Sequence, residues 1–133
     1  MNPDPSTVCK QVLVVEDVPV LRLMATAFVE DAGFEAIAAC NADEAVCILE
    51  SRNDIRIVFT DIEMPGTMDG MKLAACIRDR WPPVEIILTS GYFAPKDVTL
   101  PARGLFFAKP YDPRAVREAM RRMAGYGQAV PRS

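Results

Sequence analysis

Five polar side chains, each placed just after a short apolar run, could act together on a phosphate group. Glu16 and Asp17 follow the first run, Asp61 follows a later one, and Ser90 and Lys109 follow two more. If the runs are adjacent parallel strands, these side chains meet at one sheet edge. Three clustered carboxylates repel one another unless a cation is present, and Mg²⁺ accepts carboxylates together with a phosphate. A lysine and a hydroxyl facing Asp61 would bind the oxygens of a phosphoryl group on it, which favours a nucleophile over a general base.

The elements that must position these side chains alternate along the chain. Apolar and β-branched runs predict strands at 11–15, 34–39, 56–60, 84–89 and 105–108. A helix is predicted over 19–32, with one apolar face that comprises Leu21, Met24, Ala25, Phe28 and Ala32. Asn41 with Glu44 three residues later, Asp69, and Asp112 before Pro113 predict the starts of three further helices.

Strands that alternate with helices predict an α/β domain: a parallel sheet with helices on both faces. In such sheets ligands bind at the carboxyl ends of the strands. Residues 93–103 leave room for a short helix at most, because Pro95 and Pro101 interrupt them. We expect one domain over 10–124, with tails at 1–9 and 125–133.

The composition excludes several classes of protein. The chain of 133 residues contains no histidine, which removes imidazole as general base, zinc ligand or phosphoryl carrier. The net charge of −3 gives no basic signature of nucleic-acid or membrane binding. No apolar run approaches the roughly 20 residues that span a bilayer, and the N-terminus lacks a secretory signal pattern. We expect a cytoplasmic protein with reduced thiols at Cys9, Cys40, Cys47 and Cys76.

Five short motifs resemble the receiver domain of two-component response regulators, of the stand-alone type similar to chemotaxis regulators. They run in order over nearly the whole chain: Leu13-Val14-Val15-Glu16-Asp17, Asp61-Ile62-Glu63-Met64-Pro65, Met68-Asp69-Gly70, Thr89-Ser90-Gly91 and Lys109-Pro110. The resemblance implies a flavodoxin-like, doubly wound sheet of five parallel strands in the order 2-1-3-4-5. It also implies a phosphoryl group on an aspartate and a bound Mg²⁺, with Mn²⁺ as the alternative.

Carried over by position, the resemblance assigns a role to each motif residue. Asp61 becomes the phospho-acceptor, and Lys109 contacts the phosphoryl group. The metal ligands would be Asp17, Asp61 and the backbone carbonyl of Glu63, with Glu16 acting through water. Ser90 is the switch hydroxyl, with Thr89 as the alternative, and Phe106 is the switch aromatic, unless it is ordinary core. Pro110 is typically cis in this family.

The sequence departs from the family pattern in two places. The loop from Met64 to Gly70 has one residue more than the usual acceptor loop, so its shape is expected to differ. Residues 92–109 are short for the usual helix, strand and loops, so a short or mobile fourth helix is expected. The stretch Ser90-Gly91-Tyr92 also resembles a subgroup of stand-alone alphaproteobacterial receivers.

We therefore expect a single-domain response regulator that is not an enzyme. A histidine kinase or histidine phosphotransfer protein would phosphorylate Asp61, and the altered surface would bind another protein or pass the phosphoryl group on. The expected state is a monomer or a phosphorylation-dependent dimer, without DNA or membrane partners. Two alternatives stay open: a small aspartate-nucleophile phosphatase of haloacid-dehalogenase type, and a pseudo-receiver that only binds proteins. The basic side of the last helix is either a solvated face or a docking surface; it comprises Arg114, Arg117, Arg121 and Arg122.

Overall fold

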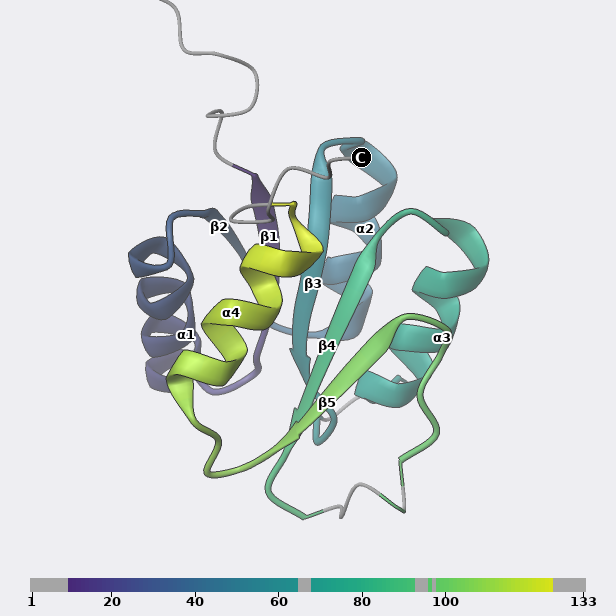
Figure 1. Ribbon diagram of the computed structural model, residues 1–133. Coiled ribbons are helices and arrows are strands. Elements are labelled where there is room, and N and C mark those ends of the chain that lie inside the picture. The colour runs from purple at the N-terminus through teal and green to yellow at the C-terminus, as the bar shows by residue number, and fades with distance from the viewer. Residues whose placement is uncertain (1–9, 65–67, 93–95, 97, 126–133) are drawn as a thin grey trace, which may run out of the picture.

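The computed structural model describes residues 10–64, 68–92, 96 and 98–125 as an alternation of strands and helices (Figure 1). The predicted tails, at 1–9 and from 126 onward, lie outside the described residues. The elements in chain order are β1 (Gln11–Val15), α1 (Pro19–Asp31), β2 (Glu35–Ala39), α2 (Ala42–Ser51), β3 (Ile55–Asp61), α3 (Gly70–Arg80), β4 (Glu85–Ser90), β5 (Gly104–Ala108) and α4 (Pro113–Met123).

The strands form one parallel sheet in the order β2-β1-β3-β4-β5, which confirms the predicted fold class. In the register, Val15 lies opposite Thr60 and Asp61 lies opposite Thr89. Between β4 and β5, Ser90 lies opposite Ala108, the residue before Lys109. The carboxyl ends of β1, β3, β4 and β5 are therefore level, and the residues that follow them share one edge of the sheet.

Two helices cover each face of the sheet (Figure 1). On one face, Val29 of α1 and Met120 of α4 pack with Val14 and Phe59 of the sheet. On the other face, α2 and α3 pack over the opposite side chains of the same strands. Because both faces are covered, β1, β3 and β4 are almost continuously apolar and buried rather than alternating in polarity.

Local signals in the sequence set the starts of three helices. The side chain of Asn41 accepts a hydrogen bond from the Glu44 amide at 2.8 Å, and that of Asp69 accepts one from the Lys72 amide at 2.9 Å. The Asp112 side chain caps α4, and Pro113 occupies its first turn. These caps satisfy amides that the first helical turn leaves without partners, as the sequence predicted.

The crossover from β4 to β5 differs from the other crossovers. Residues 91, 92, 96 and 98–103 form no α-helix, in agreement with the prediction that the helix between the fourth and fifth strands is short or mobile. Residues 93–95 and 97 lie outside the description. Val98 packs against the core on the side of α2 and α3. The end of the crossover is held by Arg78, whose side chain donates to the carbonyl of Ala102 at 2.8 Å.

The predicted apolar face of α1 is only partly covered. Ala32 is buried and Phe28 is half-buried, whereas Leu21 is 42 % exposed and Met24 is 62 % exposed. Leu21 and Met24 instead line an open pocket between α1 and the start of α4. Among the described residues, no helix is both long enough and apolar enough to cross a membrane.

Candidate functional site

Asp61, the last residue of the central strand β3, holds a buried carboxylate with two different oxygens. Its Oδ2 accepts a hydrogen bond from Lys109 Nζ at 3.1 Å. Its Oδ1 is buried and has no hydrogen-bond partner among the described residues. Burial raises the pKa of Asp61, although the Lys109 ammonium acts in the opposite direction. One oxygen is thus neutralised and the other is left for a ligand.

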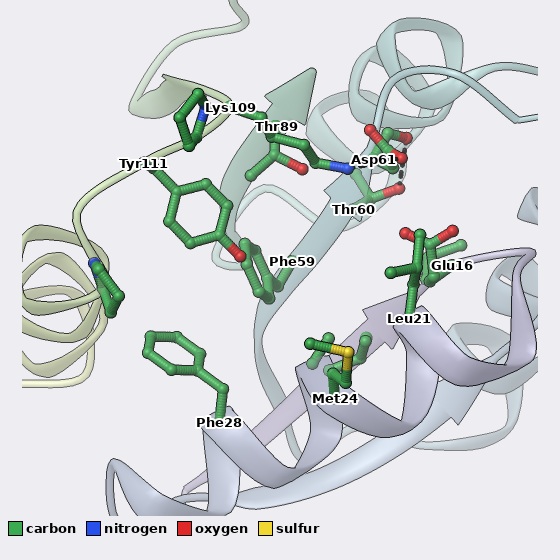
Figure 2. Close-up of a pocket in the computed structure, with 15 residues that line it drawn as sticks. Glu16, Leu21, Met24, Phe28, Phe59, Thr60, Asp61, Thr89, Lys109 and Tyr111 are labelled. Atoms are coloured by element: carbon green, nitrogen blue, oxygen red, sulfur yellow. Dashed lines mark hydrogen bonds and ion pairs between the residues drawn. The ribbon is translucent and has the colours of Figure 1, made fainter. Parts of the chain in front are cut away.

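Lys109 reaches Asp61 from the end of the edge strand β5 (Figure 2). Its amide donates to the Ser90 carbonyl at 2.8 Å, and the following bond to Pro110 is cis. Burial acts to lower the pKa of Lys109, but the hydrogen bond and the negative charge of Asp61 outweigh it, so the pKa is raised. The ammonium form is therefore the one that faces Asp61.

The acidic pair follows β1, and α1 holds it in place. Glu16 is buried, and its carboxylate accepts a hydrogen bond from the Val18 amide at 3.2 Å. Burial raises the pKa of Glu16, and the nearby charge of Asp61 adds to this rise. Arg22 Nη1 of α1 donates to the carbonyls of Glu16 at 2.8 Å and Asp17 at 3.5 Å. No sequence motif pointed to Arg22, because its partners are backbone carbonyls.

The residues suit a divalent cation with oxygen ligands. Within the described residues, no group of three or more Cys, Asp or Glu side chains lies together as a ready-made metal site. However, Asp61 Oδ1 lacks a partner, and burial of Glu16 near Asp61 disfavours their two negative charges. A cation beside Asp61 would offset both. Mg²⁺ keeps several waters and needs only one or two carboxylates, so a set of few side chains fits it.

Two hydroxyls end β4, and they have different surroundings. Thr89 lies opposite Asp61 in the sheet, accepts the Ile62 amide on its carbonyl at 2.8 Å, and lines the same pocket as Lys109. Ser90 is fully buried, and its hydroxyl donates to the side-chain carboxylate of Glu63. The sequence placed only the Glu63 backbone at the site and did not anticipate this side-chain contact.

Phe106 and Phe107 lie on opposite faces of β5, as neighbouring strand residues do. Phe106 is half-buried against the core formed with α2 and α3. Phe107 joins the core formed with α1 and α4, where its ring meets Tyr111 at 6.5 Å between centroids. By the alternation of β4, the Ser90 side chain shares the sheet face of Phe106.

An open pocket of about 570 Å³ leads from the surface of α1 to Asp61 and Lys109 (Figure 2). Its walls are mainly apolar, and its largest lining side chains are Leu21, Met24, Phe28, Phe59 and Tyr111. Burial raises the pKa of the Tyr111 phenol. Tyr111 was not predicted as a site residue; its one signal in the sequence is an aromatic residue directly after Lys109-Pro110.

Comparison with known proteins places the chain in a family. Residues 12–121 match the family model of the response regulator receiver domain. The chain is 32 % identical over 117 residues to the response regulator protein FleR of Pseudomonas aeruginosa, which covers 86 % of this chain and 24 % of that protein. It is 36 % identical over 85 residues to the transcriptional regulatory protein AruR of the same species, which covers 61 % of this chain and 34 % of AruR. The chain thus spans about a quarter of FleR and about a third of AruR.

Solved structures agree with these sequence matches. A response regulator receiver protein from Sinorhizobium medicae superposes with a TM-score of 0.79 and 25 % identity, over 89 % of this chain and 96 % of that chain. The receiver domain of the hybrid histidine kinase CckA superposes with a TM-score of 0.71 and 26 % identity, over 86 % and 98 % of the two chains. With a buried carboxylate at the carboxyl end of β3 and a family match over residues 12–121, the chain belongs to the response regulator receiver domain family.

Proposed function

We propose that Asp61 accepts a phosphoryl group from a phosphohistidine on another protein. The single observation that carries this is the difference between the two oxygens of its carboxylate. Oδ2 binds Lys109, while Oδ1 is buried without a hydrogen-bond partner among the described residues. In the transfer, an Asp61 oxygen forms a bond to phosphorus as the phosphorus–nitrogen bond breaks. The electron pair of that bond stays on the imidazole nitrogen of the donor, which then takes up a proton.

Lys109 and a hydroxyl at the end of β4 would bind the new phosphoryl oxygens. We assign this hydroxyl to Ser90, with Thr89 as the alternative, and Phe106 to the change of packing that follows. Asp17, Asp61 and the Glu63 carbonyl would hold Mg²⁺ or Mn²⁺, with Glu16 acting through water. The bound cation would neutralise charge on the transferring group.

The phosphoryl donor must be a second protein, because the chain contains no histidine. A histidine kinase or a histidine phosphotransfer protein fits this requirement. The surface of α1 supports a protein donor, since Val20, Leu23 and Met24 are 61–69 % exposed on the helix that borders the pocket. Exposed apolar side chains beside a reactive group are typical of a protein-docking surface.

We further propose a stand-alone signalling unit over residues 10–124, whose phosphorylated surface binds a protein target or passes the phosphoryl group on. It would act as a monomer or a phosphorylation-dependent dimer, without enzymatic turnover of small molecules. The free thiols at Cys40, Cys47 and Cys76 support a reducing compartment such as the cytoplasm.

Intact-protein mass after incubation with acetyl phosphate tests this function. Wild type with Mg²⁺ should gain a single phosphate, whereas Asp61→Asn, or wild type in chelator, should gain none. Asp79→Asn, an exposed change of equal charge on α3, should label like wild type. Continued turnover of a generic phosphate ester would favour the phosphatase alternative. Absence of both labelling and beryllofluoride binding would favour the pseudo-receiver.

A further inference from the structure

The Glu63 side chain forms a bidentate contact with the end of β4. One carboxylate oxygen, Oε2, accepts the hydroxyl hydrogen of Ser90, and the other, Oε1, accepts the Gly91 amide at 3.3 Å. The Ser90 oxygen in turn accepts the Tyr92 amide at 3.0 Å, which fixes the direction of its hydroxyl. An anion of this chain is therefore bound by a side-chain and a backbone donor beside the acceptor.

These donors lie at the end of β4, the strand that neighbours the strand of Asp61. Strand β4 directly neighbours β3, with Thr89 opposite Asp61, so Ser90 and Gly91 are the next residues beyond the acceptor. The Ser90 carbonyl also accepts the amide of Lys109, which ties this turn to the lysine that binds Asp61. A serine hydroxyl has one hydrogen to donate, so it cannot serve Glu63 and a phosphoryl oxygen fully at once.

We propose that the Glu63 carboxylate is a tethered competitor of the phosphoryl group for the Ser90 hydroxyl and the Gly91 amide. Phosphorylation of Asp61 expels Glu63 from these donors. The inference rests on the proposed function, because it assumes that a phosphoryl group forms at Asp61. It adds to that function a residue that sets how readily the site accepts its anion.

Beryllofluoride binding in the presence of Mg²⁺, measured by titration calorimetry, tests the competition without any phosphoryl donor. Glu63→Gln keeps the shape but loses the charge, and Glu63→Asp keeps the charge but is one methylene too short for the same contact. Both should bind beryllofluoride about tenfold more tightly than wild type, the order expected for a lost charge-assisted hydrogen bond. Glu50→Gln is the charge-matched control: this exposed residue pairs with Arg80 at the opposite end of β3, and its affinity should stay within about twofold.

The aspartate variant separates competition from a general charge effect. If Glu63→Gln gains affinity while Glu63→Asp behaves as wild type, the negative charge alone is responsible and the proposal is wrong. Unchanged or weaker binding by Glu63→Gln overturns it as well. Before any ligand is added, both variants should also shift the amide proton resonance of Gly91, and the Glu50→Gln control should not.

The outcomes also distinguish this inference from the proposed function. If wild type binds beryllofluoride and labels with acetyl phosphate, but the Glu63 variants gain nothing, only the competition is refuted. If wild type and all variants fail both assays, the phosphoryl-acceptor function fails, and the competition fails with it.

Discussion

At the scale of single residues, the site contains two buried carboxylates whose negative charges are unfavourable. Asp61 and Glu16 are both buried, and burial raises the pKa of each carboxyl. Lys109 compensates only one oxygen of Asp61. A protein that kept this arrangement only for stability would gain by neutralising it, so the arrangement indicates a site built for a ligand.

Removal of the Asp61 charge should therefore stabilise the fold. Asp61→Asn should raise the free energy of unfolding at pH 7, in chelator, by about 1 kcal/mol, because a neutral amide avoids the buried charge while Lys109 stays partly solvated. The folded pKa lies above the ordinary value, so the folded state binds more protons and wild type loses stability as pH rises through that window. The advantage of the variant should disappear below the ordinary aspartate pKa of about 4.

Urea unfolding at pH 7 and in the acid range measures this difference. Asp79→Asn, an exposed change on α3, should differ from wild type by less than about 0.5 kcal/mol at either pH. An Asp61→Asn protein less stable than wild type at pH 7 would show that the Lys109 contact outweighs the burial of the charge.

Magnesium should reverse the charge penalty in wild type. A ligand at ten times its dissociation constant adds about 1.4 kcal/mol to the folded state. Mg²⁺ should therefore raise the melting temperature of wild type and have little effect on Asp61→Asn. Sodium chloride at equal ionic strength is the control, and equal shifts by the two salts would contradict a specific site.

At the scale of elements, α3 begins in direct contact with the end of β3. A Cβ atom on Gly70 would lie 2.3 Å from the Asp61 carbonyl oxygen and 2.7 Å from Ile62 Cα. The Gly70 amide also donates to the Ile62 carbonyl at 2.9 Å. The first residue of α3 must therefore lack a side chain for Asp61 to keep its position.

Gly70→Ala should destabilise the protein by about 2–3 kcal/mol, because backbone atoms have to move to admit the methyl group. It should also reduce acetyl phosphate labelling, since the displaced backbone carries Asp61. Gly91→Ala is the control for stability, because no described residue other than its chain neighbours has an atom within 4 Å of the added carbon. Equal melting temperatures for the two variants would show that the backbone after β3 moves to admit the methyl group at little cost in stability.

The second element with a positioning role is α1, through Arg22 and the carbonyls of the acidic pair. Arg22→Met keeps the apolar stem but removes these hydrogen bonds, and should cost about 1 kcal/mol of stability. It should weaken Mg²⁺ binding more than the exposed control Arg114→Met does. Equal Mg²⁺ affinities in a magnesium titration would mean that the loop keeps its shape without Arg22.

At the scale of the whole molecule, the sequence predicted the fold well because its signals were local and repeated. Each strand was an apolar run, and helix starts such as those at Asn41, Asp69 and Asp112 carried their own caps. The meeting of Asp61 with Lys109 also followed, since parallel strands with level ends bring their following residues to one edge.

What the sequence could not predict depended on distant contacts. Leu21 and Met24 are exposed and line the pocket between α1 and the start of α4. The spacing of apolar residues within α1 cannot predict where another helix lies. Arg22 binds backbone carbonyls, which leave no mark in a motif. The Glu63 contact required the loop after β3 to turn toward β4, where Ser90 ends its strand.

The Asp61–Lys109 contact joins strands of unequal support. β3 is hydrogen-bonded on both sides, whereas β5 is an edge strand bonded on one side only. Edge strands open locally at lower free energy than central ones, so their amides exchange with solvent faster. A group held between Asp61 and Lys109 would fasten the edge to the centre. Amide exchange across Gly104–Ala108 should then slow on phosphorylation of Asp61, while exchange in β3 changes little. Phosphorylation of one carboxylate would thus lower the rate at which the edge strand opens.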